Sequence, residues 1–262
     1  MGAATGLVSA HRGGAGRARE NSRSALEHAA TLGYDYVEFD VQVTADEQFV
    51  LLHDARITLA GRSVRVSSVS HATLVEAVGD VVTLAEAAQV LRGRTKAHVD
   101  LKLVSPPDRY AQPETTAEVA AVAQVLQHLG PDGFLVTTEH DQSVRAIREW
   151  ARTHAPGLLV GLSIGRGVVR LGPLRVFWWS EVFPERRLVA AQANLVVAHK
   201  GLARLRAAKA ARRLGLPLLV YTVNDDRTLR RWLDQAWLVT TDVPARALAL
   251  RDPGAGRPRD AT

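Results

Sequence analysis

Short apolar runs recur along the chain, separated by segments whose apolar residues return every three or four positions. The runs are four to eight residues long, as strands are, and lie at residues 7–10, 36–41, 96–103, 134–138, 158–164, 194–199, 216–223 and 236–241. The segments between them have the spacing of amphipathic helices. Eight alternations of strand and helix predict an α/β protein with a parallel sheet, folded as a (β/α)8 TIM barrel.

Glycines and capping residues mark the ends of the predicted helices. Helices are expected over residues 22–33, 83–93 and 115–130, and each closes on a glycine. Thr83, followed three residues later by Glu86, is typical of a capping box at a helix start.

A further apolar run at residues 48–54 follows the second predicted strand after only the polar turn 44–47. So short a connection predicts a hairpin, because a parallel crossover needs a dozen or so residues. We therefore expect a short hairpin extension in the second βα loop.

An open doubly wound sheet is the alternative architecture. Its dinucleotide-binding form carries G-x-G-x-x-G in the first turn, whereas HRGGAG (11–16) is rich in glycine but lacks that spacing. We expect one barrel domain over residues 1–250 and a flexible tail, rich in Pro, Gly and Arg, over residues 251–262.

Composition and charge limit the sites and partners to be considered. The chain has no cysteine, which excludes disulfides, thiolate metal sites and a cysteine nucleophile. Residues 145–262 are basic, but their arginines are scattered along helical patterns without interleaved aromatics, so we expect no nucleic-acid partner. The N-terminus lacks a secretory pattern and no long apolar stretch occurs, so we expect a cytoplasmic protein.

Ionisable residues stand at the ends of the predicted strands, where a (β/α)8 barrel carries its active site. Glu38 and Asp40 share one face of the second strand, because residues two apart point the same way, and Asp100 and Lys102 do so on the third. Polar groups also follow the other runs, namely His11-Arg12, His53-Asp54, Glu139-His140, His199-Lys200, Asn224 and Asp242.

These residue types together point to metal-assisted phosphoryl transfer. The three carboxylates of the second and third strands form an oxygen-rich site suited to Mg²⁺ or Ca²⁺. Two histidines, His11 and His53, can act as general acid and base near neutral pH. Arg12 and Lys102 supply positive charge for a phosphate.

Each of these residues also has a structural interpretation. Glu38 and Asp40 could pair with arginines that hold the barrel together, and His11 could be a loop histidine with its hydrogen bonds satisfied. Lys102 could form a salt bridge to Asp100, or serve as the Schiff-base lysine of an aldolase-type barrel.

The order and spacing of these residues resemble the glycerophosphodiester phosphodiesterase family. The similarity is carried by His11-Arg12-Gly13, Glu20-Asn21-Ser22, VEFDVQVTADEQFVLLHD (37–54), VDLKL (99–103), YTVND (221–225) and VTTDVP (239–244). The resemblance implies a barrel enzyme that uses a divalent metal to hydrolyse glycerophosphodiesters to glycerol 3-phosphate and an alcohol.

The same resemblance implies a role for each residue of the site. It assigns the metal to Glu38, Asp40 and Asp100, and acid/base catalysis to His11 and His53. It assigns phosphate contacts to Arg12 and Lys102, and a further polar contact to Glu20.

The chain departs from the family pattern at four places. No proline precedes Glu20, Asp100 stands where the family has glutamate, and Tyr221 replaces the common tryptophan. After the fourth strand, Thr138-Glu139 replaces serine–phenylalanine, so an apolar wall becomes a carboxylate and the substrate is in question.

Two other functions are compatible with this pattern. A phosphatidylinositol-type phospholipase barrel also carries two histidines, and a non-catalytic barrel could bind phosphodiesters without cleaving them. Lysophospholipids are alternative substrates for the phosphodiesterase itself.

The segment 165–187 combines aromatic residues with arginines, and the aromatics are Phe177, Trp178, Trp179 and Phe183. As a βα loop it would overhang the mouth of the active site. Two interpretations are open. The aromatics pack a helix against the barrel, or the loop is an exposed lid that contacts a membrane and selects apolar substrates.

Overall fold

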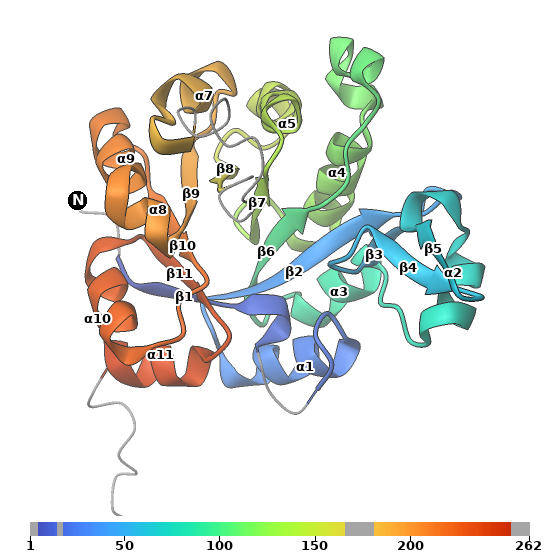
Figure 1. The fold of residues 1–262 in the computed structure, drawn as a ribbon, viewed down its shortest axis with the longest axis horizontal. Helices are drawn as coiled ribbons and strands as arrows, with labels where there is room; N and C mark the ends of the chain where they lie inside the picture. The colour runs from blue at the N-terminus through green and yellow to red at the C-terminus, as the bar shows by residue number, and fades with distance from the viewer. Residues whose placement is uncertain (1–4, 15–17, 166–180, 253–262) are drawn as a thin grey trace, which may run out of the picture.

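The computed structural model describes residues 5–14, 18–165 and 181–252 and shows a closed parallel barrel ringed by helices (Figure 1). Its eight strands are β1 (Leu7–Ala10), β2 (Tyr36–Val43), β6 (Lys96–Leu101), β7 (Phe134–Thr138), β8 (Val160–Ile164), β9 (Leu195–His199), β10 (Leu218–Tyr221) and β11 (Leu238–Thr241). Each predicted run forms one of them. Because β1 pairs in parallel with both β2 and β11, the sheet closes, and the open doubly wound alternative is excluded.

Helices follow most of the strands and cover the outside of the barrel (Figure 1). They are α1 (Arg23–Leu32), α2 (His71–Val78), α3 (Leu84–Leu91), α4 (Ala117–Leu129), α5 (Asp141–His154), α7 (Glu185–Ala190), α8 (Lys200–Leu202), α9 (Ala208–Leu214), α10 (Asp226–Gln235) and α11 (Pro244–Arg251). The predicted capping box is present, since Thr83 Oγ1 accepts from the Glu86 N–H and the Glu86 side chain accepts from the Thr83 N–H. Gly33 ends α1 in the left-handed conformation, as its position predicted.

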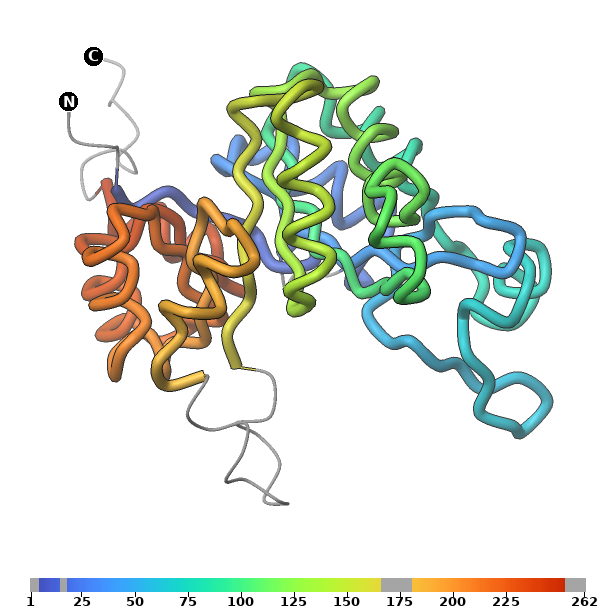
Figure 2. Tube along the Cα trace, turned by 90° about the horizontal axis from the view of Figure 1, so that it is seen from above, coloured from blue at the N-terminus to red at the C-terminus, as the bar shows by residue number. Residues whose placement is uncertain are grey.

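A lobe of two hairpins extends from the second βα connection. The predicted hairpin is confirmed, because β3 (Phe49–Leu51) runs antiparallel to β2. A second hairpin, β4 (Arg56–Leu59) with β5 (Arg62–Arg65), was not predicted. From above, this lobe projects on the side of the barrel away from α9 and α10 (Figure 2).

The inside of the barrel is apolar at one end and polar at the other. Six side chains from five strands form the apolar floor, which consists of Tyr36, Leu135, Leu195, Val197, Leu219 and Leu238. Nearer the carboxyl ends, the inward positions of β2 and β6 are taken by Glu38, Asp40 and Asp100. A separate, larger apolar core packs the outer face of the strands against the helices.

No helix in the described ranges is both long and apolar enough to span a membrane. Residues 253–262 of the expected tail lie outside the described residues, as do Phe177, Trp178 and Trp179 of the expected lid.

Gly161 on β8 provides a test of the packing within the apolar floor. A Cβ atom there would lie 2.4 Å from Val197 Cγ2, and the branched valine has little freedom to move aside. We expect Gly161→Ala to lower the free energy of unfolding, measured with urea, by about 1–3 kcal/mol. Gly157→Ala is the matched control, since nothing lies within 4 Å of its Cβ position. Equal stability of the two variants would show that the interior has room at this level.

Candidate active site

A cavity of about 220 Å³ opens at the carboxyl ends of the barrel strands. All but one of the site residues expected from the sequence line it, the exception being Glu20. Chain segments far apart in sequence therefore converge on the end of the barrel where this fold carries its chemistry.

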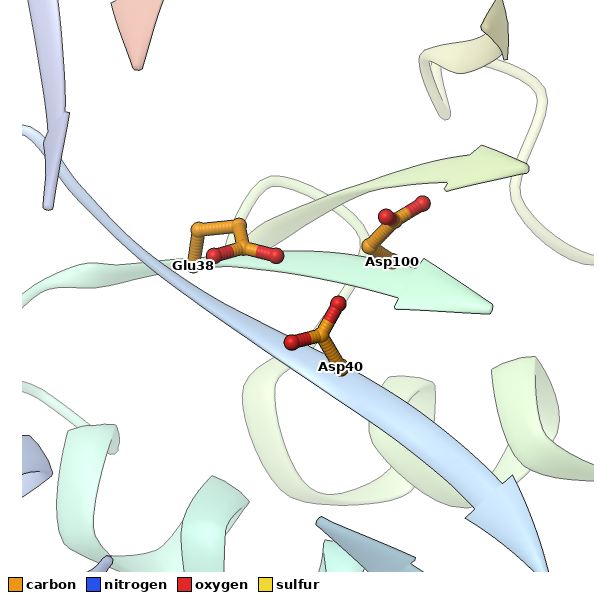
Figure 3. A group of neighbouring side chains, drawn as sticks. All are labelled: Glu38, Asp40 and Asp100. Atoms are coloured by element: carbon orange, nitrogen blue, oxygen red, sulfur yellow. The ribbon is translucent and has the colours of Figure 1, made fainter. Parts of the chain in front are cut away.

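Three carboxylates form the deepest polar group of the cavity. Glu38 and Asp40 lie on β2 and Asp100 on β6, and the strand register places Asp40 directly opposite Asp100. Each offers an oxygen within 4.8 Å of the others. Figure 3 shows the three side chains gathered on one side of the two strands.

The turn after β1 holds Glu38 in place. The backbone N–H of Arg12 donates to Glu38 Oε2 at 2.7 Å, and it reaches that oxygen because Arg12 adopts a left-handed conformation, with φ of 50°. Gly13 follows, also at positive φ, where a Cβ would lie 2.7 Å from the Ala25 Cβ on α1. The glycine of His11-Arg12-Gly13 thus permits the close approach of this turn to α1.

Asp40 is held on several sides. Arg12 Nε lies 3.0 Å and Lys102 Nζ 3.3 Å from its oxygens. The Asn21 side chain donates to Asp40 Oδ2 at 3.0 Å and accepts from the Asp40 N–H at 3.2 Å. The sequence analysis assigns no role to Asn21. Its position next to Glu20, in the motif shared with the family, could have identified it as a residue of the site.

Lys102 neutralises part of this charge. Its ammonium group lies 2.5 Å from Asp100 Oδ2, so the salt bridge considered from the sequence is present. Burial alone would lower the pKa of Lys102, but Asp100 and Asp40 outweigh burial and raise it. A lysine held as a cation is a poor amine nucleophile, which argues against the Schiff-base interpretation.

The remaining charge makes the group suited to a divalent cation. Burial, together with the nearby Asp40 and Asp100, raises the pKa of Glu38 well above its usual range. A cation held by the three carboxylates would offset this repulsion, and carboxylate oxygens are ligands that Mg²⁺ and Ca²⁺ prefer. The donor set therefore fits a hard divalent ion.

His11 is oriented by the last strand of the barrel. Its Nδ1 lies 2.6 Å from Asp242 Oδ1, while its Nε2 faces Glu38 at 3.9 Å. Asp242 is held in turn by Asn224, whose amide donates to Asp242 Oδ2 at 2.6 Å. The sequence placed Asp242 and Asn224 at strand ends without assigning them this role.

His53 lies at the rim of the cavity, in the connection after β3. Its side chain is 45% exposed, against 20% for His11, and its Nδ1 lies 2.8 Å from Asp54 Oδ1. The two histidines therefore line one cavity from different depths. His199, the other histidine considered after a strand, instead caps the next helix by accepting from the Gly201 N–H.

Glu20 lies behind the site and contacts the cavity residues through Arg12. Its carboxylate is 55% exposed and accepts from Arg12 Nη1 at 2.7 Å. The structure brings Glu20 to the guanidinium rather than into the cavity, so it is placed to position Arg12.

A buried histidine on β6 lies opposite Glu38 in the strand register. His98 on β6 contacts Ser9 Oγ at 3.2 Å and Thr137 Oγ1 at 3.0 Å, and Thr137 donates to Asp100 Oδ1. Burial lowers the pKa of His98 to about 3, so its ring is neutral. His98 lies two residues before Asp100, as Lys102 lies two residues after it, so all three belong to one face of the strand. This spacing could have identified His98 from the sequence.

Comparisons with known proteins agree with this architecture. The chain is 45% identical over 65 residues to Lysophospholipase D GDPD1 of Rattus norvegicus, a stretch that covers 24% of this chain and 21% of that protein. The match thus spans about a fifth of that relative. A glycerophosphodiester phosphodiesterase from Parabacteroides distasonis shares the fold, with a TM-score of 0.74, 20% identity and coverage of 97% of this chain and 100% of that one.

A phosphodiesterase of Oleispira antarctica, solved in complex with the product sn-glycerol-3-phosphate, is also similar in fold. Its TM-score is 0.70 at 21% identity, and the match covers 95% of this chain and 97% of that one. The model of the Glycerophosphoryl diester phosphodiesterase family matches residues 11–245. Since that match takes in nearly the whole chain, the protein belongs to the glycerophosphoryl diester phosphodiesterase family of enzymes.

Proposed function

We propose that this protein hydrolyses glycerophosphodiesters to glycerol 3-phosphate and an alcohol. The observation that carries the proposal is the arrangement of the cavity, where a carboxylate cluster, two histidines and two cations face one space. A non-catalytic barrel would have no need of all these groups together, and the family match favours this activity over that of a phosphatidylinositol-type lipase.

Glu38, Asp40 and Asp100 would hold a divalent ion, either Mg²⁺ or Ca²⁺. When bound, such an ion supplies positive charge that stabilises the oxygens of the reacting phosphate. Asp100 is one methylene shorter than the glutamate common at this position. Its contacts with Thr137 and Lys102 hold the Asp100 carboxylate in place.

Arg12 and Lys102 would contact the substrate phosphate. Their side chains are 19% and 25% exposed, so part of each cation reaches the cavity while the rest pairs with the buried acids. Glu20 would support this contact by holding the Arg12 guanidinium.

His11 and His53 would transfer the protons. Asp242 accepts from His11 Nδ1–H in the arrangement we propose, which leaves Nε2 as a base directed toward the carboxylate cluster. His53, at the exposed rim, would protonate the alcohol as it leaves. This assignment rests on the depth and partners of each ring.

The nucleophile we propose is the hydroxyl of the substrate's own glycerol, adjacent to the phosphoester. His11 would take its proton, the hydroxyl oxygen would attack phosphorus, and the alcohol would leave with a proton from His53. The resulting cyclic phosphate would then be opened by water to glycerol 3-phosphate. A neighbouring hydroxyl is favoured because it is already positioned for attack.

Lysophospholipids are a second candidate substrate class. The likeness to a protein named lysophospholipase D, although confined to 65 residues, favours acylated diesters. Phe183, 39% exposed and with Arg206 4.6 Å from its ring centroid, would belong to the membrane contact that we propose for the segment 165–187. A chain-length series of lysophospholipids would separate this class from water-soluble diesters.

Replacing Glu38 by Gln tests the metal site. We expect the release of glycerol 3-phosphate to fall about 100-fold or more, because several kcal/mol of transition-state stabilisation is lost. Calorimetry should show weaker binding of Mg²⁺ or Ca²⁺. Chelation should abolish turnover without unfolding the protein. Glu76→Gln, at an exposed position on α2, is the control. Full activity and full metal affinity in the Glu38 variant would refute the site.

The proton transfers are tested by His11→Ala and His53→Ala. Each should lower kcat by about 10²–10⁴-fold without changing the melting temperature. The double variant should lose much less than the product of the two effects, because both residues act in one reaction path. His128→Ala, at the end of α4, should be unaffected. Fully multiplicative losses would mean that the two histidines act independently.

The nucleophile is tested with a diester that lacks the glycerol hydroxyl next to the phosphoester. We expect turnover to fall by at least about a thousandfold, because an intramolecular attack of large effective molarity is no longer available. Phosphorus NMR of the normal reaction should show a transient cyclic phosphate. Similar rates for the two diesters would mean that water attacks phosphorus directly.

A further inference from the structure

One carboxylate of the cavity, that of Glu139, has no partner among the described residues. Glu139 follows β7 and lines the same space as the proposed catalytic groups. The deeper acids each have a cation or histidine close by, whereas the Glu139 carboxylate makes no hydrogen bond or ion pair with any residue in the described ranges. A charged group kept in a binding cavity without a partner needs a ligand or solvent to offset it.

Arg187 on α7 fixes the backbone of Glu139 without neutralising its side chain. The guanidinium donates to the Glu139 backbone oxygen at 3.4 Å. Its charge is offset elsewhere, since Nε lies 3.0 Å from Asp141 Oδ1 and Nη1 lies 2.6 Å from Glu181 Oε1. Arg187 therefore holds the backbone after β7 in position, while the Glu139 carboxylate lines the cavity.

A neutral aromatic ring accompanies this carboxylate. Tyr221 lines the same cavity, and its ring packs edge-on against His199 with the centroids 6.2 Å apart. Burial and the charge of Glu139 both raise the pKa of the Tyr221 phenol, so it stays protonated. A carboxylate beside an aromatic ring is a combination that binds ammonium groups.

The two cations of the cavity are already committed at its deeper side. Arg12 pairs with Asp40 and Glu20, and Lys102 pairs with Asp40 and Asp100. Among the described residues, the cluster with ligand oxygens within 4.8 Å of one another contains Glu38, Asp40 and Asp100 and does not include Glu139. Neither a salt bridge with a described residue nor membership of that carboxylate cluster accounts for this side chain.

In a glycerophosphodiester, the glycerol is neutral and the phosphate is an anion, so the alcohol is the part that can carry a positive charge. We propose that Glu139, with the Tyr221 ring in the same cavity, selects glycerophosphodiesters whose alcohol carries an ammonium group. The proposal rests on the proposed function and adds a substrate class to it. The same carboxylate disfavours diesters with an anionic alcohol by repulsion.

The experiment compares kcat/KM for two diesters of glycerol 3-phosphate, one with choline and one with glycerol. We expect the wild-type protein to favour the choline diester by about fivefold, the effect of one partly solvated charge pair, and salt at about 0.5 M to reduce the preference. Glu139→Gln should abolish the preference, mainly through KM of the choline diester. Tetramethylammonium should inhibit hydrolysis of the glycerol diester by the wild type, and the Gln variant far more weakly.

Two further variants complete the design. Glu139→Asp should keep the preference, and Glu76→Gln, which removes one charge from the exposed face of α2, should leave both substrates unaffected. Equal loss on both diesters in Glu139→Gln, or no charge preference in the wild type, would overturn the proposal while leaving the phosphodiesterase function standing. Failure of the wild type to hydrolyse either diester would instead overturn the proposed function, and this inference with it.

Discussion

Repulsion among three closely spaced carboxylates, two of them buried and one partly buried, is the constraint on which the active end of the barrel depends. Charges removed from water are stable only when they are paired and hydrogen-bonded. The left-handed turn at Arg12, the side chain of Asn21 and the ammonium of Lys102 all serve this end. These three features lie at separate places in the sequence, but each offsets part of the same negative charge. The negative charge that remains makes the site suited to a divalent ion.

The apolar floor of the barrel gives that arrangement its rigidity and strength. Below the acids, large side chains such as Leu135 and Leu219 fill the interior, so water reaches the site from the open end. Electrostatic interactions are stronger beside such a medium than in water. His98 marks the boundary between the two halves, because its neutral ring links hydroxyls from β1 and β7 to Asp100 without adding charge.

Closure of the barrel determines how the two histidines that we propose to transfer protons are supported. Since β1 lies beside β11, His11 near the start of the chain meets Asp242 near its end. His53 has no comparable support among the described residues, because it comes from the lobe outside the barrel and its ring contacts the neighbouring Asp54. The two histidines thus differ in hydrogen-bond support and in exposure because they come from different parts of the fold. This difference is the basis for proposing different roles for them.

Local patterns in the sequence determined the strands, the barrel and most residues of the site. The spacing of apolar residues and the capping of helices depend on residues close together in the sequence. The eight strands and the pairing of Asp100 with Lys102 could therefore be predicted. The β4–β5 hairpin could not, because its four-residue strands are largely exposed and carry no clear apolar alternation. Tertiary structure alone set Asp40 opposite Asp100, directed Asp242 to His11 and left Glu139 without a partner among the described residues. These relations depend on strand register and barrel closure between residues distant in sequence.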